Sequence, residues 1–311
     1  MKILVTGANG FVGSLLTEEL RSQGHIVIKS VRKVRSPDEL CHGELSKKTS
    51  WKDLLPGCDI VIHLAAMVHL IKDSSKNKSS VYLRINSDAT VKLAKESLKF
   101  KVKKFIFIST AKVNGESGHF DSIVCPKPNN SYAYSKWHAE KKLIKIFSKS
   151  GCDLLILRPP LIYGPCVSAN FLNLIRLIKL RIPLPLRNIK NNRSLLFVRN
   201  LTSFISFYVC QKNKIGVNTF FISDPTPIST PGLIQLISKA MGINLILFPM
   251  NIKLLHFFAS LIGRRSELMK LTSSLTVDNL RLLKKMRWSQ PYTTKHGIEL
   301  TIKELIKKND S

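Results

Sequence analysis

The first thirteen residues hold the feature that most constrains the fold of this chain. An apolar run over Lys2–Val5 leads directly into the glycine-rich stretch Thr6–Gly13 (TGANGFVG), and a helical pattern begins at once. In such a strand–turn–helix unit, Gly7 permits the tight turn, Gly10 leaves room for a pyrophosphate, and Gly13 lets helix and strand pack closely. The phosphates would lie on the free amides and the positive end of the helix. The stretch therefore predicts a dinucleotide-binding turn.

Further along the chain, short apolar runs alternate with longer amphipathic ones. Strands are predicted at Lys2–Thr6, Ile26–Val31, Asp59–Leu64, Lys104–Ser109, Asp153–Leu157 and Thr219–Ile222. Helices are predicted between them at Phe11–Gln23, Asn86–Phe100 and Tyr132–Ser150. Several strands are continuously apolar, as buried parallel strands are. The repeated β-α-β order predicts an α/β fold with a doubly wound parallel Rossmann sheet.

This alternation weakens beyond about residue 165, which predicts a second, smaller mixed α/β domain for the substrate. We assign residues 1–165 to the dinucleotide-binding Rossmann domain, with a returning strand and helix near 201–223. Residues 166–200 and 224–311 are assigned to the substrate-binding domain. The substrate would bind in the crevice between the two parts, at the carboxyl ends of the strands.

The charge of the chain is strongly basic, because 49 Lys and Arg stand against 20 Asp and Glu, giving +29. Such an excess favours anionic partners, including nucleotides, nucleic acid or an acidic membrane surface. The lysines are scattered rather than gathered in a block, so nucleic acid is not the expected partner. The six cysteines form neither a CxxC motif nor a zinc-ligand pattern. We expect no metal site and a reducing, cytoplasmic location.

No stretch of the sequence reaches the roughly 20 apolar residues that a membrane-spanning helix needs. The longest candidate, Leu254–Gly263, is too short and ends at Arg264-Arg265. The simplest interpretation is a packed helix. Its basic end leaves a contact with a membrane surface as the alternative.

A second signal is the segment Ser131–Lys136 (SYAYSK). Tyr132 and Lys136 are four residues apart, so they share one face of a helix. A free phenol has a pKa of about 10 and is a poor base at neutral pH. A neighbouring ammonium stabilises the phenolate and lowers that pKa. Tyr132 could then exchange a proton with a substrate hydroxyl or carbonyl while hydride moves to or from a nicotinamide ring.

Hydroxyl side chains stand at the end of the predicted strand Lys104–Ser109. Ser109 and Thr110 lie at its carboxyl end, where the crevice is expected. A hydroxyl at this position can donate a hydrogen bond to the same substrate oxygen and stabilise the charge that develops on it. The alternative is a plain cap of the strand end.

At this point the chain resembles the extended short-chain dehydrogenase/reductase family, in its nucleotide-sugar epimerase/dehydratase branch. The resemblance covers most of the chain. It is carried by TGANGFVG (Thr6–Gly13), HLAA (His63–Ala66), STAKVNG (Ser109–Gly115), YAYSK (Tyr132–Lys136) and LRPPLIYGP (Leu157–Pro165). It implies an enzyme, a UDP-sugar substrate and a homodimer.

The resemblance also implies roles for single residues. Thr110, Tyr132 and Lys136 take the catalytic Ser/Thr, Tyr and Lys positions. The implied cofactor-binding residues are Gly7, Asn9, Gly10, Phe11, Val12, Gly13, Arg32, Glu44, Leu45, Leu64, Ala65, Ala66, Tyr132, Lys136 and Pro159. Asn170 and Arg193 match positions that contact the phosphates of the substrate.

The sequence departs from the family pattern after the second strand, which usually ends near an acid for the adenosine ribose of NAD. Here the run is Lys29-Ser30-Val31-Arg32-Lys33, and the first acid beyond it is Asp38. Arg32, Lys33 or Arg35 could instead pair with a 2′-phosphate. The cofactor is therefore NAD or NADP, with NADP slightly favoured. A second departure is Arg199-Asn200, where aspartate is common.

The residues after Thr110 bear on the choice of reaction. Sugar-nucleotide 4,6-dehydratases usually carry Asp-Glu there, whereas this chain has Ala111 and Lys112. Without that carboxylate pair, water elimination lacks its acid and base. We expect C4 chemistry on a UDP-hexose, by 4-epimerisation or by 4-keto reduction. The motif wording resembles enzymes that make N-acetylated UDP-deoxyhexoses for surface polysaccharides such as the lipopolysaccharide O-antigen. The alternative is a non-catalytic Rossmann protein that senses the cofactor or binds RNA.

Overall fold

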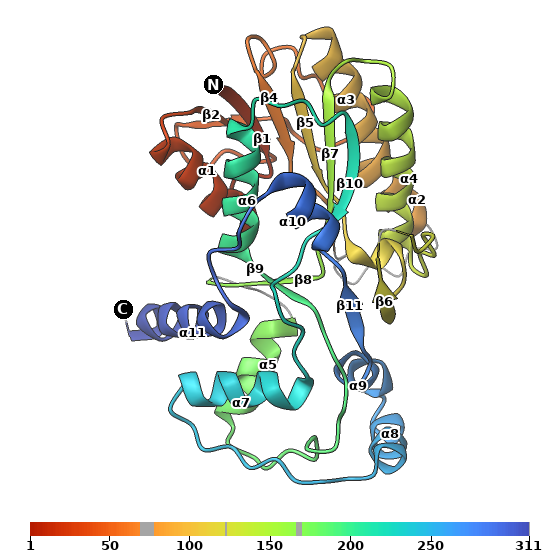
Figure 1. Ribbon diagram of the computed structural model, residues 1–311, viewed down its shortest axis with the longest axis vertical. Coiled ribbons are helices and arrows are strands. Elements are labelled where there is room, and N and C mark those ends of the chain that lie inside the picture. The colour runs from red at the N-terminus through yellow and green to blue at the C-terminus, as the bar shows by residue number, and fades with distance from the viewer. Residues whose placement is uncertain (69–77, 122, 166–169, 311) are drawn as a thin grey trace.

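The computed structural model of the protein describes residues 1–68, 78–121, 123–165 and 170–310. Within these residues, seven parallel strands form the central sheet in the order β10-β7-β5-β4-β1-β2-β3 (Figure 1). They are β1 (Lys2–Thr6), β2 (Ile26–Val31), β3 (Glu39–Cys41), β4 (Ile60–His63), β5 (Lys104–Ile108), β7 (Asp153–Arg158) and β10 (Val217–Phe221). The predicted doubly wound parallel sheet is confirmed.

The direction of winding reverses at β1. The chain first moves outward from β1 to β2 and β3, and then crosses back to β4, β5, β7 and β10 on the other side. Ile3 of β1 pairs with Val27 of β2 and with Ile60 of β4. Such a reversal opens a crevice at the carboxyl ends of the strands, where ligands bind in doubly wound folds.

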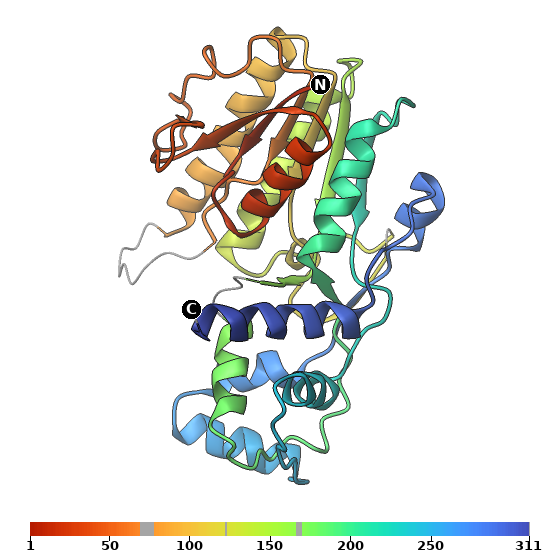
Figure 2. The ribbon, with the colours of Figure 1, turned by 90° about the vertical axis from the view of Figure 1, so that its left-hand side faces the viewer.

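Helices cover both faces of the sheet (Figure 2). The flanking helices are α1 (Phe11–Ser22), α2 (Lys78–Leu83), α3 (Ala89–Lys99), α4 (Ser131–Phe147) and α6 (Val198–Cys210). Ile3 and Val5 belong to the hydrophobic cluster that includes α1 and α6, whereas Leu4 belongs to the one that includes α3 and α4. Successive side chains of a strand point to opposite faces, so a continuous apolar run serves both layers.

The remaining elements lie mostly beyond the carboxyl edge of the sheet. They are β6 (Gly118–Phe120), β8 (Leu161–Tyr163), α5 (Asn170–Lys179), β9 (Leu195–Phe197), α7 (Thr230–Ala240), α8 (Ile252–Leu261), α9 (Arg265–Thr272), β11 (Leu275–Val277), α10 (Leu280–Met286) and α11 (Thr294–Asp310). A separate cluster joins α5, α7, α11 and β9. The division into two domains at residue 165 stays a prediction.

Two irregular turns complete the description. The chain winds as a π-helix, η1, over Arg84–Asp88 between α2 and α3, and as a 3₁₀ turn, η2, over Ala111–Val113 after β5. Among the described helices, none is long and apolar enough to cross a membrane.

Candidate active site

The glycine-rich turn joins β1 to α1, and its three glycines are required for different reasons. Gly7 has a φ of +70°, and a Cβ there would lie 2.9 Å from the backbone nitrogen of Ala65. A Cβ on Gly13 would collide with the carbonyl oxygen of Gly7 and come within 2.8 Å of Ala8 Cα. Gly10 is exposed, and its Cβ would meet only the Gly7 carbonyl, at 3.2 Å. Gly7 and Gly13 therefore serve the fold, while Gly10 leaves open space beside the backbone.

The start of α1 offers free hydrogen-bond donors. Gly10 is its N-cap, and no side chain of the described chain caps the helix there. Phe11 and Val12, in the first turn, are half-buried, and Asn9 is exposed. Free N–H groups and the positive end of a helix together bind phosphate. These residues fit the pyrophosphate of a dinucleotide.

A buried hydrogen-bond chain fixes this turn to β4. Thr90 Oγ1 donates to the carbonyl of Asn86 at 2.8 Å, so it accepts the hydrogen bond from His63 Nε2 at 2.9 Å. Burial lowers the pKa of His63 well below its usual value, with the charge of Lys136 adding to the effect. A neutral His63 protonated on Nε2 accepts from Thr6 Oγ1 through Nδ1, at 2.7 Å. Thr6 in turn accepts from Ala65 N at 3.3 Å.

This series of hydrogen bonds brings the glycine-rich turn and the segment His63–Ala66 together. Leu64, Ala65 and Ala66 follow β4 and are half-buried against the glycine turn. Their placement beside Gly7 agrees with a position close to a bound dinucleotide.

The predicted Tyr–Lys pair lies in the first two turns of α4. Asn130 caps this helix by accepting a hydrogen bond from Ala133 N at 2.8 Å. The cap sets where the helix begins, and so which face carries Tyr132 and Lys136. Tyr134 lies on a different face and is 40% exposed. Lys136 is 2% exposed, and its ammonium lies 4.2 Å from the centre of the Phe107 ring of β5.

Burial acts on this pair in opposite directions. It lowers the pKa of Lys136 to about 7, against which the charge of Glu140 acts. It raises the pKa of Tyr132 to about 12, and Tyr82 adds to that rise. The Tyr82 and Tyr132 rings meet edge to face, with their centroids 6.2 Å apart. At neutral pH the phenol is therefore a proton donor, and it becomes a base only when positive charge is placed beside it.

Two hydroxyl side chains, Ser109 and Thr110, lie at the carboxyl end of β5. Thr110 is 8% exposed, and its Oγ1 accepts from Lys112 N at 3.3 Å. The Ser109 hydroxyl is buried and has no hydrogen-bond partner among the described residues. Ala111 N donates to the carbonyl of Pro159 at 2.8 Å, which draws the chain after β7 to this edge. Thr110, Pro159 and α4 thus meet at the carboxyl edge of the sheet.

Asn86 is one residue at this site that the sequence analysis missed. It is 1% exposed within the π-helical turn η1. Its side chain accepts from Met67 N at 2.8 Å and donates to Met67 O at 2.9 Å and to Ser135 Oγ at 3.0 Å. It therefore ties the segment after β4 to α4. The available signal was weak, because only the frequent location of π-turns at functional sites points to it.

The end of β2 carries basic side chains, as the sequence predicts. Val31 is fully buried, whereas Arg32 and Lys33 are exposed and pair with no carboxylate of the described chain. Asp38 is held by Arg21 at 2.5 Å and by Lys29 at 2.9 Å, and these contacts, with a hydrogen bond from Ser36, lower its pKa.

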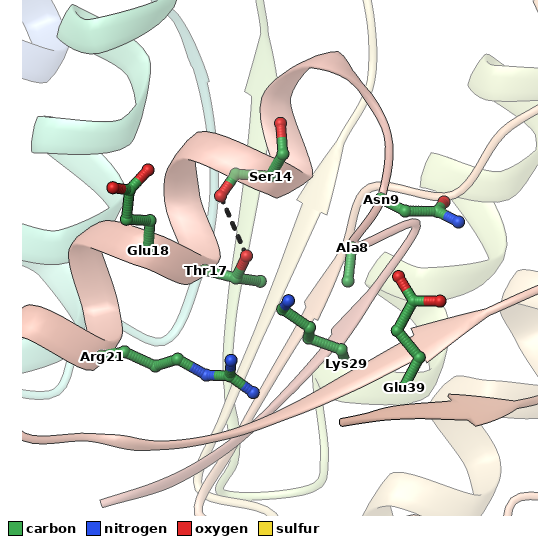
Figure 3. A pocket seen from close by; sticks show the side chains of 8 residues that line it. All are labelled: Ala8, Asn9, Ser14, Thr17, Glu18, Arg21, Lys29 and Glu39. Atoms are coloured by element: carbon green, nitrogen blue, oxygen red, sulfur yellow. Dashed lines mark hydrogen bonds between the residues drawn. The ribbon is translucent and has the colours of Figure 1, made fainter. Parts of the chain in front are cut away.

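A hollow of about 460 Å³ lies beside the glycine turn, between α1, β2 and β3 (Figure 3). Ala8, Asn9 and Lys29 line it, and Glu39 of β3 points into it. Glu39 was not predicted, because its place depends on the pairing of Lys29 with Glu39 across the strands. Glu44 is exposed and Leu45 buried in the segment that follows β3.

The two predicted substrate contacts lie beyond the carboxyl edge of the sheet. Arg193 is half-buried, and its Nη1 donates to the carbonyls of Lys270 at 2.7 Å and Ser273 at 2.9 Å. Burial lowers its pKa. Asn170 begins α5, and its side chain lies outside the part of the structure that is described.

Asn200 has a structural reason to replace an aspartate. Its side chain donates to Asp224 Oδ1 at 2.7 Å and to the carbonyl of Tyr292, and accepts from Tyr292 N. Asp224 also accepts from Tyr163 and from Phe197 N. A second carboxylate at position 200 would face Asp224 at hydrogen-bond distance, and their repulsion would break this contact.

A glycine turn on an uncapped helix at the reversal point of a parallel sheet, with Tyr132 and Lys136 on a helix that flanks the same sheet, defines a Rossmann-type dinucleotide-binding protein. The model of the NAD dependent epimerase/dehydratase family matches residues 3–221. A UDP-glucose 4-epimerase of Vibrio cholerae is 32% identical over 99% of this chain and 96% of its own. The chain therefore belongs to the NAD dependent epimerase/dehydratase family, as the sequence motifs indicated.

Solved structures agree in fold. A UDP-glucuronic acid 4-epimerase from Bacillus cereus, in complex with NAD, superposes with a TM-score of 0.80 at 21% identity, covering 99% of both chains. A UDP-N-acetylglucosamine 4-epimerase from the same species gives 0.77 at 20% identity, covering 98% of this chain and 99% of that one. The arrangement of the helices beyond the carboxyl edge of the sheet is thus shared with these proteins.

Proposed function

We propose that this protein catalyses epimerisation at C4 of a UDP-hexose, with a nicotinamide dinucleotide as cofactor. The observation that carries the proposal is the buried Lys136 on the same face of α4 as Tyr132, at the sheet edge that also holds Thr110 and the glycine turn. The full-length similarity to a protein named UDP-glucose 4-epimerase supports the reaction.

Each residue of the site has its own role in the proposed reaction. Gly10, with the amides of Phe11 and Val12, holds the pyrophosphate. When bound, the nicotinamide takes up and returns hydride at C4 of the sugar. Tyr132 removes the proton from the C4 hydroxyl and later returns it. Thr110 donates a hydrogen bond to the same oxygen.

Lys136 gives the phenol its function as a base. Without added positive charge, the pKa of Tyr132 stays near 12. The Lys136 ammonium lowers it, and a bound anionic cofactor favours that ammonium over the neutral amine.

Asn86 acts through other groups and is a positioning residue. Arg193, near the end of α9, and Asn170 bind the diphosphate of the substrate in this proposal.

The test is to incubate the purified protein with UDP-glucose and with UDP-N-acetylglucosamine, with NAD supplied, and to identify the products by NMR. We expect the C4 epimer of at least one sugar to accumulate. Tyr132→Phe serves as the matched inactive control. The proposal fails if neither sugar is epimerised, or if the variant performs as the wild type does.

A second candidate, reduction of a 4-keto UDP-hexose by NADPH, is favoured by the end of β2. Arg32 and Lys33 are exposed and without carboxylate partners in the described chain, while Asp38 is occupied by Arg21 and Lys29. A cation placed there suits a 2′-phosphate. Glu39 in the neighbouring hollow is the competing observation, since a carboxylate suits the unphosphorylated ribose of NAD.

Two variants separate these cofactor preferences. We expect Arg32→Ala to weaken NADPH binding by about tenfold or more and to leave NADH binding nearly unchanged, because a charge-assisted contact is worth roughly 1.5–3 kcal/mol. Glu39→Gln is the control, because a preference for NAD predicts that this variant weakens the binding of NADH. The NADPH assignment fails if Arg32→Ala weakens the binding of both cofactors equally. It also fails if the largest loss of affinity is the loss of NADH binding in Glu39→Gln.

We also propose a homodimer that forms through α4, a cytoplasmic location, and a role in making surface polysaccharides such as the O-antigen. Tyr134 and Ile144 on α4 are each 40% exposed and would be covered in such a dimer. Salt-dependent retention on nucleic acid without turnover of a UDP-sugar would favour the non-catalytic alternative instead.

A further inference from the structure

Helices α8 and α9 lie at the end of the molecule that is far from the sheet (Figure 1), and α8 exposes several large apolar side chains. Phe257 is 58% exposed, Leu261 68% and Ile262 69%. Together with Leu254 and Phe258, these side chains form what we call the α8 face. Large exposed apolar patches on soluble proteins mark interaction sites.

The α8 face is not the side by which the helix packs on the protein. Leu255 and Ala259, one turn apart, lie on the inner side, and Ala259 is the buried residue of α8. Leu254, Phe257, Phe258 and Leu261 lie within an arc of about 100° on the outer side. An ordinary surface helix carries polar residues on that outer arc. Here the packed side and the exposed side are both apolar.

Basic residues border the α8 face. Lys253 lies within α8, Arg264 lies in the turn after it, and Arg265 begins α9; all three are exposed. The sequence between residues 170 and 275 holds fourteen Lys and Arg but only two acids, Asp224 and Glu267. Asp224 is 2% exposed, so it adds no negative charge to the surface. The α8 face is therefore apolar and bordered by exposed cations.

We propose that the α8 face docks on the surface of an anionic phospholipid bilayer. The helix would lie in the plane of the interface, with Phe257, Phe258 and Leu261 entering the boundary between headgroups and acyl chains. Arg264, Arg265 and Lys253 would contact the lipid phosphates. Apolar burial plus attraction to anionic lipid is the physics of interfacial helices. The binding is peripheral and independent of the reaction proposed above.

Charge decides between a lipid surface and a second copy of the chain. Two copies meeting through this face would bring their Lys253, Arg264 and Arg265 together. Glu267 is the one exposed acid between residues 170 and 275 of the described chain that could offset them. Like charges in contact cost free energy, whereas an anionic bilayer supplies the opposite charge over the whole face.

The test is co-sedimentation of the full-length protein with vesicles of phosphatidylcholine, either pure or containing about 30% phosphatidylglycerol. We expect binding to the anionic vesicles, weakened by salt, and little binding to the neutral ones. Phe257→Ser with Phe258→Ser should lower the partition constant by about tenfold or more. Arg264→Ala with Arg265→Ala should lower it by about tenfold to thirtyfold.

Matched controls are Ile123→Ser, which removes an 85% exposed apolar side chain elsewhere, and Lys48→Ala with Lys52→Ala, which removes two exposed cations near the sheet. These should bind vesicles as the wild type does, and all variants should keep the wild-type melting temperature. The proposal is overturned if wild-type protein does not bind, if it binds both vesicles equally, or if the α8 variants bind normally. Light scattering that shows an oligomer dissociating in the Phe257→Ser, Phe258→Ser variant would assign the face to a second copy and also overturn it.

Discussion

At the scale of single residues, Tyr132 is proposed to act as acid and base, and its hydroxyl is not needed for the fold. Within the described chain its ring contacts Tyr82, and its hydroxyl has no hydrogen-bond partner. Tyr132→Phe keeps the ring and leaves no buried group unpaired. We expect an unchanged melting temperature and a turnover lower by a factor of about 10² to 10⁴, the usual scale for acid–base groups. Steady-state kinetics with thermal unfolding checks both, and near-normal turnover would remove Tyr132 from the mechanism.

Lys136, unlike the Tyr132 hydroxyl, affects the stability of the fold, because its charged form is buried. Its pKa falls from 10.5 to about 7 on folding, so the unfolded chain binds more protons between those values. The stability of the wild type therefore rises with pH through that window, and below about pH 7 the full cost of burying the ammonium is present. Lys136→Met removes this cost while ending catalysis. We expect a gain on the order of 3–5 kcal/mol at pH 6 that shrinks to about half at pH 9.

Urea unfolding at the two pH values measures this gain. Lys145→Met, on the exposed part of the same helix, is the control and should show no such pH dependence. If the gain in stability from Lys136→Met were the same at both pH values, the removal of a buried charge would not be the cause of that gain.

The residues of the site differ in how far the sequence could predict them. Thr110, Tyr132 and Lys136 follow from local spacing and from the end of one strand. Asn86 and Glu39 could not be derived in the same way, since their contacts join segments that are distant in the sequence. Helical periodicity reports which side of a helix is buried, but not which partner meets it.

At the scale of elements, the glycine turn contains one glycine that packing requires, Gly13, and one that is proposed to face the ligand, Gly10. Gly13→Ala would press a methyl group into the Gly7 carbonyl and the Ala8 backbone. We expect it to cost about 2–3 kcal/mol of unfolding free energy. Gly10 has an ordinary φ of −82°, and a Cβ there would meet only the Gly7 carbonyl oxygen, at 3.2 Å. Gly10→Ala should cost less than about 1 kcal/mol yet weaken dinucleotide binding by about tenfold or more.

Urea unfolding and titration of NADH fluorescence measure the two effects. The interpretation of the turn would be wrong if Gly10→Ala bound the dinucleotide as tightly as the wild type, or if the two variants lost equal stability.

The π-turn η1 is the second element whose role can be tested. Asn86→Ala removes three buried hydrogen bonds, to Met67 and to Ser135, and we expect a loss of about 2–3 kcal/mol. Ser135→Ala removes one of the three and should cost less. Because Asn86 also fixes the segment after β4, Asn86→Ala should lower dinucleotide affinity as well. Equal losses of stability in both variants, with unchanged affinity, would contradict this role.

Long buried strands were predictable, and short ones were not. The predicted Lys2–Thr6 and Ile26–Val31 match β1 and β2, since each contains a run of three consecutive apolar residues that favours a buried strand. The pairs β6–β11 and β8–β9 join three-residue segments far apart in the chain, and such segments carry no periodicity of their own. Their pairing is decided by the packing of the whole molecule.

At the scale of the whole molecule, positive charge is unevenly distributed. Residues 170–275 hold fourteen of the 49 basic residues but two of the 20 acidic ones. In the rest of the chain, acids offset about half of the basic charge, and several form ion pairs such as Lys103–Asp59 and Arg158–Glu140. Self-repulsion is therefore concentrated in residues 170–275.

This distribution predicts that salt stabilises one part of the protein more than the other. Screening weakens repulsion between exposed charges, and the Debye length falls from about 30 Å at 0.01 M to about 8 Å at 0.15 M. We expect the melting temperature to rise by about 3–6 °C between these salt concentrations. Amide hydrogen exchange should show the larger gain of protection in α5, α7, α8 and α9, and the smaller in β1, β4 and β5, where charges are paired or absent. Uniform protection, or a greater gain in the sheet, would show that the repulsion is not located where the sequence places it.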